Sequence, residues 1–249
     1  MTLKPRNRIY CPSHLSLAAT VEFDDHDKVH YLASVLRSKV GDAFALFNQN
    51  DGEWLGNIVE ILKKKITLRI NKFLRPSTPA PTLTLIFAPI KNPNASFYMQ
   101  KAVELGCSSI WPIITKFTVV RSVAADKLKQ TALDAVEQSG RFSLPTIIEA
   151  LTFKYCLSQL SQFDFVYFCD ERALSENLFL KILLKTKPGT NDAIIIGPEG
   201  GFSEEERQLL LSNKNCIGVS LGTGILRAET AMITALSLHQ QCYMRNDKH

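Results

Sequence analysis

The pattern of apolar positions changes about a third of the way along the chain. In the first part, short runs rich in β-branched and aromatic residues predict strands at residues 8–10, 20–23, 43–48, 53–61 and 66–74. The helical spacing of Val29, Leu32 and Leu36 predicts one helix. This helix would begin at Asp24 or Asp25 and end at Leu36. Several short strands with a single helix predict a small β-barrel.

Two short segments punctuate this first part. Asn50-Asp51-Gly52 predicts a hairpin turn, because Asp and Gly tolerate the left-handed conformations that a tight turn requires. The segment RPSTPAP, residues 75–81, holds three prolines and small polar residues, which neither propagate a helix nor pair in a sheet. It predicts a boundary between one domain at residues 1–75 and a second at residues 82–249.

Beyond this boundary, apolar strands alternate with amphipathic stretches. The predicted strands cover residues 83–90, 109–114, 146–149, 163–169, 193–196 and 216–220. The predicted helices run from a cap at Asn94 to Leu105, over residues 126–139, 153–161 and 175–184, from a cap at Ser203, and over residues 228–244. This alternation is typical of a parallel sheet with crossover helices, so the fold class is α/β.

Two glycine-rich turns dominate the last quarter of the chain. AIIIGPEGGFSEEE at residues 193–206 and VSLGTGILRAETA at residues 219–231 each pass from an apolar strand through glycines into a helix. Ser203 and Glu206 have the spacing of a capping box at the first of these helices. Because glycine lets a ligand approach the main chain, the two turns together predict one ligand-binding site.

The residue types in these turns narrow the chemistry. GPEGG lacks the Gly-Lys-Ser/Thr ending of a Walker A loop, and Glu199 favours a ligand that carries positive charge or hydroxyl groups, such as S-adenosylmethionine. Arg227, at the opening of the last helix, would stabilise negative charge on a substrate, and Glu229 or Thr230 would accept or position a proton. Both turns also have a structural interpretation: a tight turn with a solvated Glu199, and a helix start with Arg227 in a surface ion pair.

Composition and charge limit the function classes. No apolar run among the 249 residues approaches the roughly 20 that a membrane span needs. The charged start lacks a following apolar region, so we expect no signal peptide and a cytoplasmic location. The six cysteines and five histidines show no metal-ligand spacing, so we expect reduced thiols and no metal. Of the net charge of +5, residues 1–75 carry +4 (12 basic against 8 acidic), which fits an RNA-facing first domain, although an ordinary solvated surface is the commoner interpretation.

The two turns resemble the signature motifs of the RsmE family of SPOUT-superfamily RNA methyltransferases, which methylate N3 of a uridine in 16S ribosomal RNA of the small ribosomal subunit. Three further segments resemble family motifs in the same order: HYLASVLR at residues 30–37, QKAVELG at residues 100–106 and AVEQSGR at residues 135–141. The resemblance covers essentially the whole chain.

The resemblance implies a PUA-like β-barrel followed by a SPOUT domain with a trefoil knot, a homodimer, and S-adenosylmethionine as the cofactor. Carried onto this chain, it implies that residues 168–171 form a further loop of the knot. For the proton transfer that methylation at N3 requires, Arg227 and Glu229 are the candidate catalytic residues, and Glu229 has the alternative role of a capping or intersubunit residue. The cofactor would be bound by Ile196, Gly197, Pro198, Glu199, Gly200, Gly201, Leu221, Gly222, Ile225, Leu226, Arg227 and Thr230. RNA would be bound by Arg8, Arg37, Lys39, Lys91, Arg121 and Arg141.

The chain departs from the family pattern at two places. Thr223-Gly224 replace the usual proline and its neighbour, which leaves the second turn freer, and Ala228 replaces a threonine. Residues 116–120 read KFTVV where the family often has E-R-S-V-V, so an arginine is missing. Two alternative functions stay open: a SPOUT methyltransferase with another RNA target such as tRNA, and an RNA-binding assembly protein that has lost its cofactor.

Overall fold

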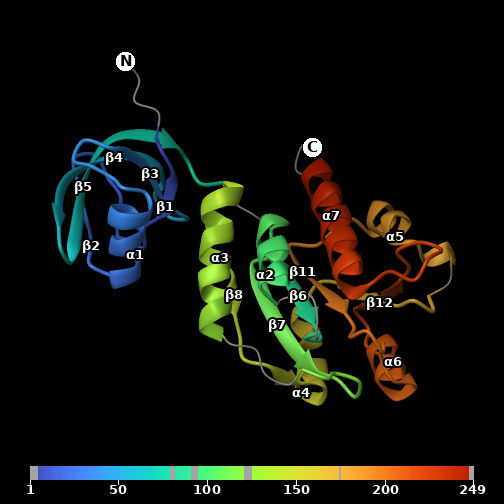
Figure 1. The fold of residues 1–249 in the computed structure, drawn as a ribbon. Helices are drawn as coiled ribbons and strands as arrows, with labels where there is room; N and C mark the ends of the chain where they lie inside the picture. Colours follow the sequence, from blue (N-terminus) through green and yellow to red (C-terminus); the bar gives the residue numbers. More distant parts are fainter. Residues whose placement is uncertain (1–4, 79–81, 91–94, 121–124, 174, 247–249) are drawn as a thin grey trace. The chain divides into compact units, whose positions relative to one another are not determined.

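The computed structural model describes residues 5–78, 82–90, 95–120, 125–173 and 175–246 (Figure 1). The chain divides into two compact units. One unit is Met1–Pro79 with Val136–Ser143, and the other is Ala80–Ala135 with Leu144–His249. The first unit therefore takes in a short segment from far beyond the proline-rich stretch. No helix in the described ranges is long and apolar enough to cross a membrane.

The first unit is built on a curved five-stranded sheet, drawn in blue to teal in Figure 1. Its strands are β1 (Arg8–Tyr10), β2 (Thr20–Phe23), β3 (Ala43–Asn48), β4 (Gly52–Leu62) and β5 (Lys65–Arg75). The spatial order is β1-β3-β4-β5-β2, with β1 parallel to β3 and the other pairs antiparallel. Register shifts between β4 and β5 bend this pair. Among the described residues no ladder joins β1 to β2, so the hydrogen bonds define an open curved sheet where the pattern predicted a barrel.

The predicted helix of this unit forms in two parts. Asp25 caps α1 (His26–His30) by accepting a hydrogen bond from the Lys28 amide at 2.9 Å. The chain then continues as a π-helix over Tyr31–Val35, where the Leu36 amide donates to the Tyr31 carbonyl five residues earlier. Arg37 ends it with a φ of 50°. Helical spacing predicted the extent of this element but not its wider second half.

The second unit contains a parallel sheet in the order β12-β10-β11-β6-β7-β8, as the alternating pattern predicted. The strands are β6 (Thr82–Phe87), β7 (Ser109–Ile114), β8 (Thr146–Ile147), β10 (Val166–Cys169), β11 (Asn191–Ile196) and β12 (Cys216–Val219). A short β9 (Leu151–Thr152), which the sequence pattern missed, also pairs with β7. The predicted strand at residues 163–169 begins only at Val166, and the one at residues 83–90 ends at Phe87.

Helices cover both faces of this sheet. They are α2 (Ala95–Glu104), α3 (Ala125–Ser139), α4 (Phe153–Gln159), α5 (Phe179–Thr186), α6 (Glu204–Leu211) and α7 (Ala228–Asn246). Side chains alternate along β10: Val166 and Phe168 pack in one apolar cluster with residues of α4 and α6. Tyr167, between them, contacts Phe179 of α5 and His239 of α7 on the other face. The predicted cap Asn94 lies outside the described residues.

One buried polar pair ties α7 to the sheet. His239 Nε2 of α7 lies 2.8 Å from Asp192 Oδ2 of β11, and both side chains are fully buried. The same carboxylate accepts hydrogen bonds from the Gly189 amide at 2.8 Å and the Phe165 amide at 3.2 Å. Because three donors depend on one buried acceptor group, Asp192 fixes the position of α7, the helix whose first turn adjoins the second glycine-rich loop.

We expect Asp192→Ala to lower the free energy of unfolding by roughly 3–5 kcal/mol, because it leaves buried donors without an acceptor. Asp164→Ala is the matched control. Asp164 is exposed and accepts from the Thr190 and Asn191 amides at 2.9 and 3.0 Å, so water replaces it and the loss is about 1 kcal/mol. Urea unfolding measures both variants. Equal losses would contradict the role assigned to Asp192.

Candidate functional site

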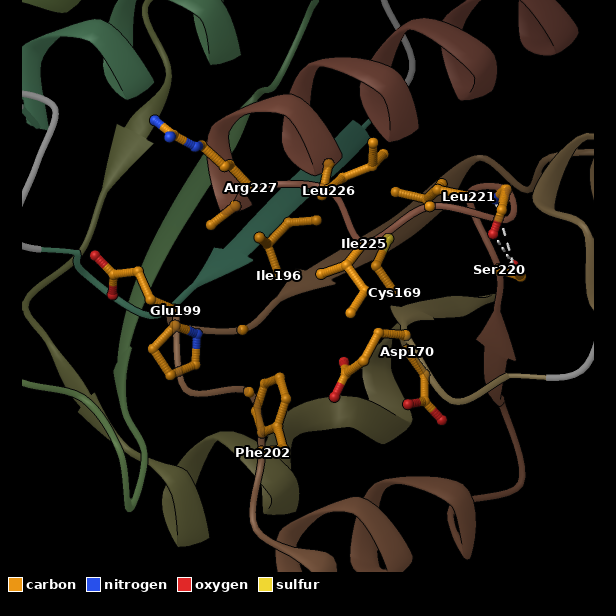
Figure 2. Close-up of a pocket in the computed structure, with 18 of the residues that line it drawn as sticks. Cys169, Asp170, Ile196, Glu199, Phe202, Ser220, Leu221, Ile225, Leu226 and Arg227 are labelled. Atoms are coloured by element: carbon orange, nitrogen blue, oxygen red, sulfur yellow. Dashed lines mark hydrogen bonds between the residues drawn. The ribbon is translucent and has the colours of Figure 1, made fainter.

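The carboxyl ends of three neighbouring strands converge on one pocket. β10 pairs in parallel with β11 on one side and β12 on the other, so the loops that follow these strands emerge at the same edge of the sheet. Together the loops enclose a cavity of about 830 Å³. Its lining comes from residues 169–171 after β10, 196–202 after β11, and 219–229 and 231 after β12 (Figure 2).

The turn after β11 has a fixed backbone. The Gly201 amide donates to the Pro198 carbonyl at 2.9 Å, and Gly201 has a φ of 68°, which favours glycine. A Cβ at Gly197 would lie 2.7 Å from the Phe202 ring, so close packing also requires glycine there. The predicted capping box is present: Ser203 and Glu206 exchange hydrogen bonds at the start of α6. The GPEGG turn is therefore a pre-formed wall of the pocket.

The loop after β12 is more open. The Gly222 amide donates to Ser220 Oγ at 3.3 Å, and Gly222 has a φ of 134°. A Cβ built on Gly222 or Gly224 would meet no atom within 4 Å. The Ile225 side chain lines the cavity and is nevertheless 89% exposed. This wall leaves space in which a ligand can approach the main chain.

The charged groups of the pocket are unevenly distributed. In Figure 2, Arg227 and Glu199 lie toward one end, and Asp170 and Ser220 toward the other. Glu229 in the first turn of α7 belongs to the end with Glu199, because both carboxylates act on the same hydroxyl. That hydroxyl is Tyr98 of α2, whose pKa is raised by burial and then by the negative charges of Glu229 and Glu199.

Arg227 stands immediately before α7. Its guanidinium forms no ion pair with any residue in the described part of the chain, and its side chain is exposed. The alternative interpretation of Arg227 as half of a surface ion pair therefore finds no partner within the described ranges. The pocket presents an available cation within the same lining as four carboxylates, those of Asp170, Glu171, Glu199 and Glu229.

The opposite end of the pocket is held by a buried acidic residue. Asp170, whose side chain is 2% exposed, accepts hydrogen bonds from Arg207 Nε at 2.8 Å and from the Arg172 amide at 3.0 Å. These bonds fix the loop after β10 to α6. Sequence reasoning placed this loop in the site only through the family resemblance, and it missed Phe202 and Ser220. An acidic residue directly after a buried strand was the available signal.

The structure brings most of the predicted cofactor residues together. All of those in the first turn line the cavity, as do Leu221, Gly222, Ile225, Leu226 and Arg227 of the second. Thr230 is the exception, because it lies exposed in the first turn of α7 and is not part of the lining. Glu229, the other predicted catalytic residue, does line it. Among the described residues no group of His, Cys, Asp and Glu could hold a metal ion.

Arg8 does not behave as a surface cation. Its guanidinium donates to Glu53 Oε2 at 3.1 Å and to the carbonyls of Val136 and Arg141 at 3.0 Å each. It also lies 3.8 Å from the centre of the Phe47 ring. With its side chain 17% exposed, Arg8 holds the first unit together. These contacts favour a structural role for Arg8, and its role as an RNA contact stays a prediction.

The other predicted RNA contacts differ in their surroundings. Arg37 and Lys39 are exposed on the first unit, as an RNA contact requires. Arg141 is half-buried, and its carbonyl accepts from Arg8. Lys91 and Arg121 lie outside the described residues.

The sequence matches two family profiles. Residues 77–240 match the RNA methyltransferase domain, and residues 23–71 match the RNA methyltransferase PUA domain. A relative from Rickettsia conorii, named ribosomal RNA small subunit methyltransferase E, is 38% identical over 93% of each chain. A relative of the same name from Bacillus subtilis is 25% identical over 89% of this chain and 91% of its own.

Solved structures agree with this relationship. A ribosomal RNA small subunit methyltransferase E from Neisseria gonorrhoeae, bound to S-adenosyl methionine, has a TM-score of 0.80 at 25% identity, covering 94% of this chain and 97% of its own. A Legionella pneumophila chain, solved with the bound cofactor SAM, has a TM-score of 0.79 at 28% identity, covering 94% and 96%. The match of the domain profile to most of the chain, together with the relative at 38% identity, shows that this chain belongs to the RNA methyltransferase family.

Proposed function

We propose that the chain transfers a methyl group from S-adenosylmethionine to N3 of a uridine in 16S ribosomal RNA of the small ribosomal subunit. The observation that carries this proposal is the pocket itself, in which two glycine-rich turns enclose an available cation, Arg227, with the carboxylates of Glu199 and Glu229. The small-subunit ribosomal RNA relatives and the neighbour bound to S-adenosyl methionine support the substrate class and the cofactor.

The residues present fit this cofactor. A cavity of about 830 Å³ is within the range of roughly 300–1,000 Å³ that is usual for small-molecule sites. Ile196, Phe202 and Leu226 provide apolar surface for a base, and the glycines expose main-chain donors and acceptors. Acidic side chains in the lining suit a ligand that carries a sulfonium charge and ribose hydroxyls. S-adenosylmethionine supplies, when bound, a methyl group on an electron-poor sulfur.

The chain's own side chains would handle the charge and the proton of the acceptor base. Uracil N3 becomes nucleophilic when its proton leaves, and the remaining negative charge spreads onto the carbonyl oxygens O2 and O4. Arg227 stays protonated and presents a planar set of donors to such oxygens. Glu229, at the same end of the pocket as Glu199, is the proposed proton acceptor or orienting group.

We propose two further features of the assembly. The first is a trefoil knot formed by the loops that follow β10, β11 and β12, which the family resemblance implies. The second is a homodimer. Exposed apolar side chains on α5, Leu180 at 46% and Leu184 at 52%, support it because such groups are commonly covered by a partner. Sedimentation of the purified chain as a 27.9 kDa monomer would refute the dimer.

The function is tested on ribosomal RNA from a strain that lacks this gene. We expect mass analysis and primer extension to show an unmethylated uridine, which the purified chain and S-adenosylmethionine convert to N3-methyluridine. Arg227→Ala should bind the cofactor normally by calorimetry while turnover falls roughly 10²- to 10³-fold, because one charge-stabilising group is lost.

Arg245→Ala, at the other end of α7, is the matched control and should keep full turnover. Normal methylation in the deletion strain would overturn the assignment of function. Unchanged turnover of Arg227→Ala would instead remove only this residue from the chemistry.

Cofactor binding has its own test at Ile225. Because this side chain is 89% exposed, Ile225→Ala should leave the free energy of unfolding within about 0.5 kcal/mol of the original. If S-adenosylmethionine fills the pocket, the same change removes an apolar contact and should lower the affinity for the cofactor about tenfold. Leu209→Ala, on α6 outside the lining, should leave the affinity unchanged. Calorimetric titration measures the affinity of both variants for the cofactor. An unchanged affinity of Ile225→Ala would show that the cofactor does not contact the loop after β12.

A further inference from the structure

An exposed aromatic side chain adjoins the wall of the pocket and takes no part in the function described above. Phe117 follows β7 and is 46% exposed, and Val119 two residues later is 69% exposed. Exposing a large apolar side chain to water costs free energy, which a partner that covers it would recover. Neither residue belongs to the lining of the cavity. Their position and exposure therefore call for a separate explanation.

The turn that carries Phe117 is pinned on both sides. The Thr115 amide donates to Thr118 Oγ1 at 2.9 Å, the two hydroxyls lie 2.8 Å apart, and the Thr118 amide donates to the Thr115 carbonyl at 3.2 Å. The Lys116 amide donates to Glu206 Oε1 at 2.8 Å. Glu206 is buried and also caps α6, so the turn is fixed to the scaffold of the site. An exposed ring on a pinned turn is a pre-organised contact surface.

The ring adjoins the wall of the pocket directly. A Cβ built on Gly200 would lie 3.2 Å from Phe117 Cβ and 3.6 Å from its Cγ, so the backbone of GPEGG contacts one edge of this side chain. Gly200 itself lines the cavity, next to Glu199. Phe117 therefore lies directly against the wall at this end of the pocket. A positive group accompanies the ring, because Lys116 Nζ lies 5.9 Å from the ring centre and its side chain is exposed.

We propose that Phe117 stacks against an unpaired nucleobase adjacent to the methyl acceptor and that Lys116 contacts the phosphate beside it. This inference rests on the proposed function, since it assumes an RNA substrate. N3 of uracil lies on the base-pairing edge, so the acceptor is reached only in unpaired RNA, whose neighbouring bases expose their faces. The acceptor base must meet the cofactor's methyl group at the pocket, whereas Phe117 lies outside the lining and so meets a neighbouring base.

The chemistry of the two side chains favours this occupant over a second copy of the chain. Aromatic rings paired with cations are the usual contacts of single-stranded nucleic acid, in which bases stack and phosphates meet lysine or arginine. A self-interface would be expected to bury an apolar side chain among others and to exclude an unpaired lysine. Lys116 forms no ion pair within the described part of the chain, which leaves it available to a phosphate.

The test measures binding and methylation of a synthetic small-subunit ribosomal RNA fragment that contains the acceptor uridine. Phe117→Ala should lower the affinity for the fragment roughly 5- to 100-fold, the range that corresponds to loss of one base–aromatic stack. The affinity of Phe117→Tyr should stay within about threefold of the original because the tyrosine ring still stacks. The affinity for S-adenosylmethionine should not change in either variant. Phe73→Ala, 45% exposed on the first unit, is the control for general loss of aromatic surface.

The stacking partner is located with abasic nucleotides placed one at a time on either side of the acceptor. With the original chain, one abasic position should weaken binding as much as Phe117→Ala does. In Phe117→Ala that same position should cost nothing further, because both changes remove one contact. The inference would be overturned if the losses of affinity from the abasic nucleotide and from Phe117→Ala added fully when the two are combined. It would also be overturned if Phe117→Ala bound the original fragment with unchanged affinity.

Two other outcomes separate this inference from its foundation. If the original chain neither binds nor methylates the fragment in the presence of S-adenosylmethionine, the proposed function fails. The stacking role then fails too, because it depends on an RNA substrate. If the original chain methylates the fragment and Phe117→Ala does so with equal affinity, only the stacking role fails. If Phe117→Ala shifts the sedimentation of the chain from dimer to monomer while RNA affinity is unchanged, the ring belongs to a self-interface.

Discussion

The pairing of β10 with two parallel neighbours is the constraint on which the site depends. Since β11 and β12 flank β10 in the same direction, their three following loops meet at one sheet edge although they are separated by up to about fifty residues of sequence. Neither glycine-rich turn alone encloses a cavity. Their convergence does, and it brings an available cation together with carboxylates from different elements.

Carboxylates perform two distinct tasks in the second unit. Asp170, Asp192 and Glu206 are buried, and each accepts hydrogen bonds from segments distant in sequence. They hold loops and helices in place, because an unsatisfied donor in the interior is costly. Glu199 and Glu229 are less buried and line the cavity, which Asp170 also reaches. The two groups of carboxylates differ in burial, which residue type alone does not reveal.

Sequence patterns predicted what depends on local interactions. The alternation of strands and helices, the capping box of Ser203 and Glu206 and the glycine-rich turns each follow from residues close together in the chain. Contacts between distant segments were not predictable. In the sequence Arg8 is indistinguishable from a surface cation, but its carbonyl partners lie 128 and 133 residues away. Thr230 follows Glu229 in sequence, yet helical geometry turns it away from the lining.

The glycines of the second loop differ in the reason for their presence. Gly222 has a φ of 134°, so the backbone itself favours glycine there. Gly224 has no such conformation, and a Cβ on it would meet no atom of the chain. Glycine costs backbone entropy on folding, and neither backbone strain nor packing in the free chain offsets that cost at residue 224. Gly224 lines the cavity, so the space beside it is open to the proposed cofactor. Thr223-Gly224, where the chain departs from its family's pattern, is thus still consistent with a ligand cradle.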